Sequence, residues 1–122
     1  SSRKMRTLFL KSKIHRARVT TSHLDYEGSL GLDEELMAAA GLSEYERVEI
    51  YNVTNGERLA TYLIKERAGS GQVGVYGAAA HKIKQGDIII ITSYGCLDEA
   101  EVKSHQPRIV LLAENNRIKQ IK

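Results

Sequence analysis

The sequence predicts a mainly β fold, a small closed β-barrel with about two or three short helices. Roughly six to eight short segments carry β-prone apolar residues, and turns containing glycine or asparagine separate them. So many strands in 122 residues would leave many edges unpaired, and closing the sheet into a barrel removes those edges. The length fits one domain over residues 5–122, with Ser1 and Ser2 set aside as additions ahead of a start near Met5.

Two strands are expected before the first helix. Residues 5–11 have an apolar centre, and residues 13–21 alternate so that Ile14 and Ala17 face opposite ways. The β-prone character continues up to the Gly28–Ser29 bond.

A short helix should follow this bond. Asp33 suits the N-cap, residues 34–40 are acidic and then rich in alanine, and Gly41 is a natural stop. The two glutamates of the first turn complement the helix dipole.

A hairpin is expected in the middle of the chain. Strands at 47–53 and 58–65 flank Asn55-Gly56, a pair that strongly favours a tight hairpin turn. A short strand at 72–76 comes next, and residues 77–81 form a glycine turn that enters a helical turn.

The last third of the chain predicts three strands and one helix. The four isoleucines at 88–91 indicate a strand buried on both faces. Asp98 with Glu101 resembles a capping box, so a helix should run from 98 to about 105. Strands at 108–113 and 118–121 complete the expected chain.

Composition argues against several classes of protein. The net charge of +3 is too small and too scattered to favour nucleic-acid binding. No apolar run approaches the roughly 18 residues of a membrane span, and no secretory signal is evident. Cys96 has no second cysteine to pair with, which fits a reducing cytoplasm. His15 and His81 lack ligand-like spacing, so no metal is expected.

Five segments carry a more specific pattern: 11–17, 26–29, 52–58 followed by Thr61-Tyr62, 77–81 and 86–87. In this order and spacing they resemble the pyruvoyl-dependent aspartate 1-decarboxylase family over nearly the whole chain. The resemblance implies a double-psi β-barrel assembled as a homotetramer with active sites at subunit interfaces. It also implies a proenzyme that cleaves itself at Gly28–Ser29 into a β chain, residues 1–28, and an α chain, residues 29–122.

The resemblance assigns the chemistry to Ser29. Its hydroxyl attacks the carbonyl of Gly28, and the serine is converted into a pyruvoyl group. Glycine before the serine leaves that carbonyl open to attack. The pyruvoyl ketone forms a Schiff base with L-aspartate and acts as the electron sink for loss of carbon dioxide, so neither pyridoxal phosphate nor a metal is needed. The product, β-alanine, serves pantothenate synthesis.

Other site residues also follow from the resemblance. Tyr62 corresponds to the proton donor, and Arg58 shares its strand face and can fork onto a carboxylate. Lys13 is a second candidate for binding the carboxylate. Thr61 is assigned to the self-cleavage intermediate and to substrate, although its parity is opposite to that of Tyr62. Backbone N–H groups of the small residues Gly77, Ala78 and Ala79 are expected to face the substrate.

One position departs from the family. An asparagine usually precedes the Gly-Ala-Ala-Ala turn, and here that residue is Tyr76. Three effects stay open: slower maturation, a reshaped pocket, or accommodation by a local shift. His15 also matches a family position and is a second candidate modulator.

Two other functions stay open from the residues alone. One is a pyruvoyl decarboxylase of another small amino acid, and the other is a small β-barrel binding module that never cleaves itself. The sequence also leaves open whether an accessory maturation factor takes part.

Overall fold

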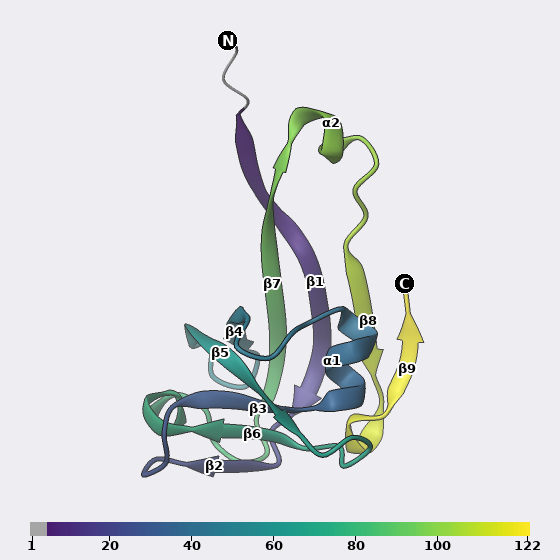
Figure 1. Ribbon diagram of the computed structural model, residues 1–122. Helices are drawn as coiled ribbons and strands as arrows, with labels where there is room; N and C mark the ends of the chain where they lie inside the picture. The colour runs from purple at the N-terminus through teal and green to yellow at the C-terminus, as the bar shows by residue number, and fades with distance from the viewer. Residues whose placement is uncertain (1–4) are drawn as a thin grey trace.

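The computed structural model describes residues 5–122 and is mainly β, as predicted (Figure 1). The expectation for residues 1–4 lies outside this range. The strands are β1 (Arg6–Arg18), β2 (Thr21–His23), β3 (Ser29–Asp33), β4 (Arg47–Asn52), β5 (Arg58–Glu66), β6 (Val73–Tyr76), β7 (Ile88–Asp98), β8 (Arg108–Leu112) and β9 (Ile118–Ile121). The helical elements are α1 (Glu34–Ala40), α2 (Glu99–Val102) and the 3-10 turns η1 (Gly77–His81) and η2 (Glu114–Asn116). No helix within this range is long and apolar enough to cross a membrane.

Hydrogen bonds join the strands in the order β2-β6-β3-β5-β4-β7-β1-β8-β9. The pairs β1–β8, β2–β6 and β3–β5 are parallel, and the other neighbours are antiparallel. Figure 1 shows β2, β3 and β6 running crosswise at the lower end of β1 and β7, and buried apolar residues of both groups of strands form one core, so the sheet wraps around that core. This wrapping is compatible with the expected closed barrel, whose closure and double-psi topology stay predictions.

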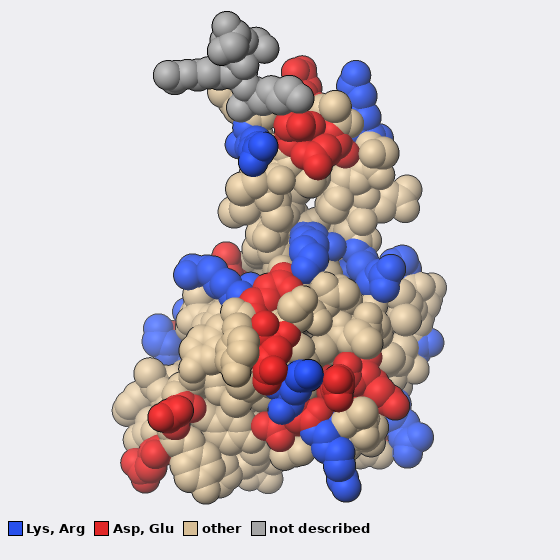
Figure 2. Space-filling model, in the orientation of Figure 1, with Lys and Arg blue, Asp and Glu red and all other residues tan. Residues whose placement is uncertain are grey.

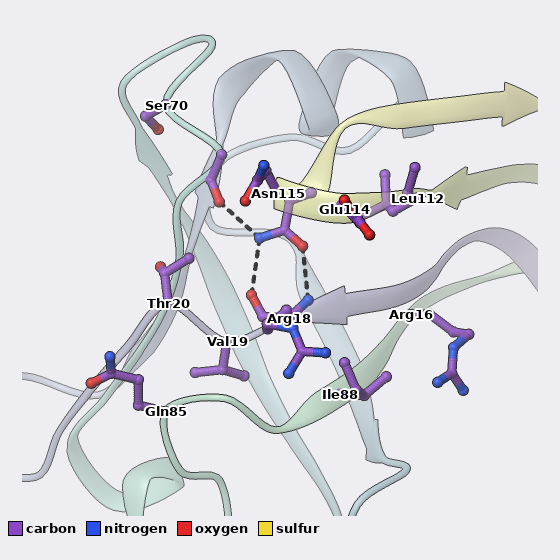
Figure 3. Close-up of a pocket in the computed structure, with 13 residues that line it drawn as sticks. Arg16, Arg18, Val19, Thr20, Ser70, Gln85, Ile88, Leu112, Glu114 and Asn115 are labelled. Carbon is purple, nitrogen blue, oxygen red and sulfur yellow. Dashed lines mark hydrogen bonds between the residues drawn. The ribbon is translucent and has the colours of Figure 1, made fainter.

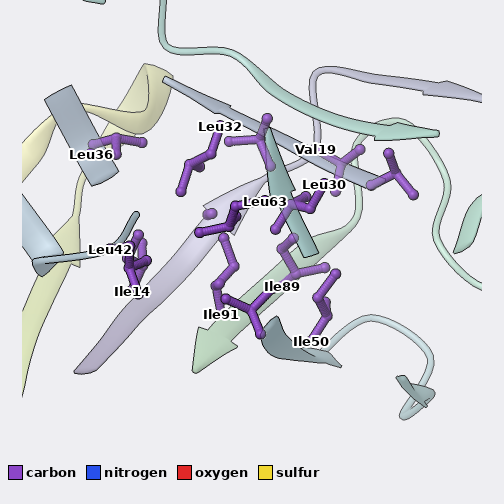
Figure 4. Packing of buried hydrophobic residues seen from close by; sticks show 14 of the residues in the cluster. Ile14, Val19, Leu30, Leu32, Leu36, Leu42, Ile50, Leu63, Ile89 and Ile91 are labelled. Atoms are coloured by element: carbon purple, nitrogen blue, oxygen red, sulfur yellow. The ribbon is translucent and has the colours of Figure 1, made fainter. Parts of the chain in front are cut away.

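The core fills the inside of this wrapped sheet. Figure 4 shows Ile14, Leu30, Leu63, Ile89 and Ile91 converging from the four strands β1, β3, β5 and β7, and each is fully buried. Burial of each such side chain stabilises the fold by roughly 1.5–3 kcal/mol before entropy is counted. On the face seen in Figure 2, by contrast, Lys and Arg are interspersed with Asp and Glu over the lower body.

The first two expected strands are one strand, β1, with a kink. Arg16 has a φ of 66°, and the register against β7 shifts between Ile14 and Ala17. The irregularity changes the alternation, so Ile14 and Ala17 are both buried. The expectation that they face opposite ways was therefore wrong.

The Gly28–Ser29 bond lies at the start of a strand that the sequence did not predict. The extended segment ends earlier than expected, because β2 stops at His23 and a turn begins at Leu24. Ser29–Asp33 then forms β3, whose five residues are all buried between β5 and β6. The bond therefore joins an exposed turn to a central strand of the sheet.

The predicted helix signals were correct at α1. The Asp33 carboxylate accepts hydrogen bonds from the backbone N–H of Glu35 at 2.8 Å, Gly69 at 3.0 Å and Gly71 at 2.8 Å. Gly41 ends the helix in the left-handed region, with a φ of 68°. The hairpin is also confirmed, since β4 and β5 pair as antiparallel neighbours around the expected turn.

Two expectations in the last third were wrong in extent. The capping box joins Asp98 and Glu101 as predicted, but α2 covers only Glu99–Val102. The strand expected at 88–91 continues to Asp98, and within it Ile88 and Ile90 are half-buried. They lie on the outer face of β7, so burial on both faces does not hold there.

Candidate active site

The site begins where β5 extends beyond β3. The first half of β5 pairs with β4, but its pairing with β3 starts only at Leu63, opposite Leu30. Within the described residues, the edge of β5 before Leu63 therefore lacks a strand partner on that side. A cavity of about 470 Å³ lies along this edge. The residues that line it are Gly28, Leu59, Ala60, Thr61, Tyr62, Tyr76, Ala78, Ala79 and Lys82.

This geometry explains how Thr61 and Tyr62 serve one cavity. Neighbouring side chains on a strand point to opposite faces, so a cavity over one face would contact only one of them. The cavity runs along the strand edge and touches four consecutive residues, 59–62. Thr61 and Tyr62 thus meet at the cavity while β5 keeps a regular register with β4.

Gly77 packs directly against the expected cleavage site. Its φ is 73°, and a Cβ added there would lie 2.5 Å from the Cα of Gly28 and 2.7 Å from its nitrogen. Such an atom would also lie 2.8 Å from the carbonyl oxygen of Tyr26. Only glycine allows both the backbone conformation and this close approach. The start of η1 is therefore held against the peptide segment that ends at Gly28.

Ser29 is buried and lacks a hydrogen-bond partner. Its residue exposure is 2%, and its Oγ is among the buried polar atoms without a partner within residues 5–122. Leaving a buried hydroxyl unpaired costs roughly 1–3 kcal/mol, so such groups are rare and often functional. Within the described residues, no hydrogen bond therefore holds the Ser29 hydroxyl, which lies one residue after Gly28.

Tyr76 lies directly opposite Ser29 across the β3–β6 pair. Its phenol donates a hydrogen bond to Glu66 Oε1 at 3.2 Å. Burial, together with the Glu66 carboxylate, raises the pKa of Tyr76 to about 12, so the phenol stays protonated at neutral pH. The sequence analysis did not identify Glu66. Glu66 lies an even number of residues after Tyr62 on β5, so strand alternation could have placed both side chains on the same face.

Two expected substrate-binding cations lie away from this cavity. The Arg58 guanidinium stacks over the ring of Tyr51, with Cζ 4.5 Å from the ring centroid. Lys13 lies on the outer face of β1. Cross-strand pairs connect it to Thr92 of β7, then to Glu49 of β4 and finally to Ala60 of β5, which lines the cavity. Lys13 is thus three strand spacings, roughly 14 Å, from Ala60. Neither cation lines the cavity that contains Gly28.

His15 lies on β1 next to β8 and is also outside the cavity. Burial, with Lys13, Arg16 and Lys122 nearby, lowers its pKa. Lys82, by contrast, lines the cavity and was missed; it forms an ion pair with Glu57 at 3.3 Å. Among residues 5–122, no group of three His, Cys, Asp or Glu side chains is placed to hold a metal ion.

A larger cavity of about 760 Å³ lies elsewhere, near the end of β1 and η2 (Figure 3). None of the predicted catalytic or substrate-binding residues lines it. The Asn116 side chain spans its wall, accepting from the Arg18 N–H at 2.8 Å and donating to the carbonyls of Arg18 at 2.9 Å and Gly71 at 2.8 Å. Its polar side chain is thus occupied in holding loops together.

Comparison with known proteins gives the family of this chain. A sequence model of the family described as aspartate decarboxylase matches residues 5–119. Aspartate 1-decarboxylase from Ralstonia pickettii (strain 12J) is 52% identical over 97% of this chain and 98% of its own. The proteins of the same name from Polynucleobacter asymbioticus and Bordetella avium (strain 197N) are 51% and 49% identical over 97% of this chain. The chain belongs to the aspartate decarboxylase family.

Proposed function

We propose that this protein decarboxylates L-aspartate to β-alanine and carbon dioxide, using a pyruvoyl group that it makes from Ser29. The observation that carries the proposal is the buried, unpartnered Ser29 hydroxyl next to a Gly28 against which Gly77 is packed. The reaction is the one named by the relatives, which match nearly the full chain. The expected setting is the cytoplasm, where β-alanine serves pantothenate synthesis.

Self-cleavage is a rearrangement within the chain. Ser29 Oγ adds to the carbonyl carbon of Gly28, and the bond from that carbon to the Ser29 nitrogen breaks, which converts the amide into an ester. Loss of the Ser29 Cα proton then expels the Gly28 carboxylate from Cβ. Water finally replaces the nitrogen, which leaves as ammonia, and the new terminus carries the pyruvoyl group.

The residues present fit such a group, since the Ser29 position is enclosed and Ser29 Oγ has no competing hydrogen-bond partner among residues 5–122. The pyruvoyl group supplies a carbonyl that condenses with the substrate amine and accepts electrons when carbon dioxide leaves. Tyr62, on the cavity wall, is the group we assign to protonate the substrate carbon. Thr61 and the backbone at 77–79 orient the substrate.

The side-chain carboxylate of L-aspartate needs a cation to bind it. The positions of Lys13 and Arg58 support an arrangement in which a second subunit supplies that cation. Both lie on the outer face of the sheet, outside the cavity of their own chain. A second copy packed on that face brings the cations to a neighbour's cavity. The proposal therefore includes a homotetramer with active sites between subunits.

Intact mass measurement of the incubated protein tests the proposal. We expect two fragments that divide after Gly28, the larger one with a blocked amino terminus, and formation of β-alanine from L-aspartate. Incubation with other small amino acids tests the related decarboxylases. A chain that stays whole after prolonged warming, alone and with a cell extract that could hold a maturation factor, would contradict the proposal and favour a binding module.

A further inference from the structure

The phenol of Tyr76 lies in a space that two glycines leave empty. On the same face as the Ser29–Tyr76 pair, the next pair of residues along β3 and β6 is Gly31 and Gly74. A Cβ on Gly74 would lie 2.6 Å from the Cζ of Tyr76, and a Cβ on Gly31 would lie 2.9 Å from its Cε2. The ring therefore extends along β6, away from Ser29, over a pair without side chains.

Glu66 holds the far end of this ring. The hydrogen bond from the phenol to Glu66 Oε1 measures 3.2 Å, and Glu66 belongs to β5, where it pairs with Asp33 of β3. A Cβ on Gly31 would also lie 2.9 Å from the Glu66 Cδ. One hydrogen bond thus links β6 to β5 across β3, directly above the two glycines.

The other direction open to the ring leads into the active site. Tyr76 lines the cavity that contains Gly28, and its Cβ lies directly across from that of Ser29. Side chains move between staggered rotamers, so a ring released from Glu66 can turn toward Ser29 and the cavity. His23 and Tyr26 flank the ring at centroid distances of 6.2 and 5.9 Å, and no hydrogen bond from either to the phenol is found within residues 5–122.

We propose that Glu66 is a positioning residue that holds the Tyr76 phenol over the Gly31–Gly74 pair and so keeps the space around Ser29 and Gly28 open for self-cleavage. The inference rests on the proposed function, because the benefit of an open site is measured as cleavage. The inference gives Glu66, which does not line the cavity, a role in the proposed self-cleavage. It also explains how this chain accommodates a large side chain opposite its nucleophile.

Three variants test the inference through cleavage. Glu66→Ala should slow self-cleavage by about tenfold or more, the factor expected for loss of a hydrogen bond to a charged group. Glu66→Gln, which keeps an acceptor for the phenol, should stay within about threefold of the parent. Tyr76→Asn should cleave at least as fast as the parent, and Glu66→Ala should add no effect in that background. Glu114→Ala, at an exposed residue away from the cavity, is the matched control.

A second readout separates this inference from the proposed function. Titration of the phenols by absorbance should show one group near pH 12 in the parent, which moves down in Glu66→Ala and is missing in Tyr76→Asn. If the parent never cleaves but this titration behaves as expected, the proposed function fails and the Glu66–Tyr76 contact stands. The inference is overturned if Glu66→Ala cleaves at the parent rate, or if it slows cleavage equally with and without Tyr76.

Discussion

Two cavities of this protein, the one at η2 and the one at Gly28, differ in what the polar groups next to them do. In the larger one, about 760 Å³, the Asn116 side chain makes three hydrogen bonds that join η2 to β1 and to the loop at Gly71. The smaller one, about 470 Å³, is lined by Gly28, and the Oγ of the adjacent buried Ser29 makes no hydrogen bond within residues 5–122. Cavity volume therefore does not distinguish the proposed site. A buried hydroxyl without a hydrogen-bond partner within residues 5–122, next to the proposed cleavage site, does distinguish it.

Removing the unpartnered hydroxyl should have the largest effect. Ser29→Ala should abolish self-cleavage and aspartate turnover while the fold persists, because the hydroxyl is the proposed attacking group and makes no hydrogen bond within residues 5–122. Intact mass and circular dichroism are the measurements. Ser12→Ala is the matched control, since Ser12 Oγ is also buried and has no partner in the described part of the chain, but it lies on β1, outside the cavity. Cleavage of Ser29→Ala at Gly28 would exclude the mechanism.

A side chain at Gly77 should rank second. Gly77→Ala combines a clash against Gly28 with a φ of 73°, and we expect about 2–4 kcal/mol of destabilisation and cleavage slowed by about a hundredfold or more. Gly86→Ala isolates the backbone cost, because Gly86 has a φ of 90° with open space around it. That variant should lose about 1–2 kcal/mol and cleave normally. Equal cleavage rates in the two variants would show that the Gly77–Gly28 contact does not matter.

Tyr62→Phe should separate maturation from turnover. The chain should cleave as the parent does, whereas kcat for aspartate should fall by about a hundredfold or more, the usual contribution of a positioned acid. Tyr45→Phe is the control: its ring centroid lies 6.4 Å from that of Tyr62, yet Tyr45 does not line the cavity. Turnover at the parent rate in Tyr62→Phe would remove Tyr62 from the role of proton donor.

A change in the larger cavity should affect stability alone. Asn116→Ala removes three hydrogen bonds and places alanine at a φ of 57°, so the free energy of unfolding should fall by about 2–4 kcal/mol. Thermal unfolding measures this loss. Cleavage and turnover below the melting temperature should match the parent, and a selective loss of either one would assign the larger cavity a part in the chemistry.

Local sequence was sufficient to predict helix ends, where a single residue determines the backbone conformation or the cap. Asp33 caps α1, Gly41 ends it, and the Asp98–Glu101 capping box forms as expected. It was insufficient at β3, where Gly31 weakens any strand signal and pairing on both sides decides the conformation. The alternation failed in β1 for a similar reason, because the kink at Arg16 is set by pairing with β7 and β8.

Sequence reasoning named residues for the candidate site but did not predict how they are arranged. Resemblance indicated Gly28, Ser29 and Tyr62, and the structure brings Gly28 and Tyr62 to one cavity with Ser29 buried next to Gly28. Glu66 was not predicted, because its role depends on a ring that crosses from another strand. The distance of Lys13 from the cavity was not predictable either, since it follows from the strand order.

The position of β1 gives the proposed cleavage a consequence for assembly of the molecule. Residues before the cut supply β1, between β7 and β8, and β2 at the side of β6. Cutting after Gly28 therefore divides one folding unit into two polypeptides that share a core. Folding of the precursor is a first-order process, whereas recovery of the denatured mature form becomes second order in its two pieces and depends on their concentrations. The proposed maturation therefore makes refolding after denaturation depend on the two fragments finding each other.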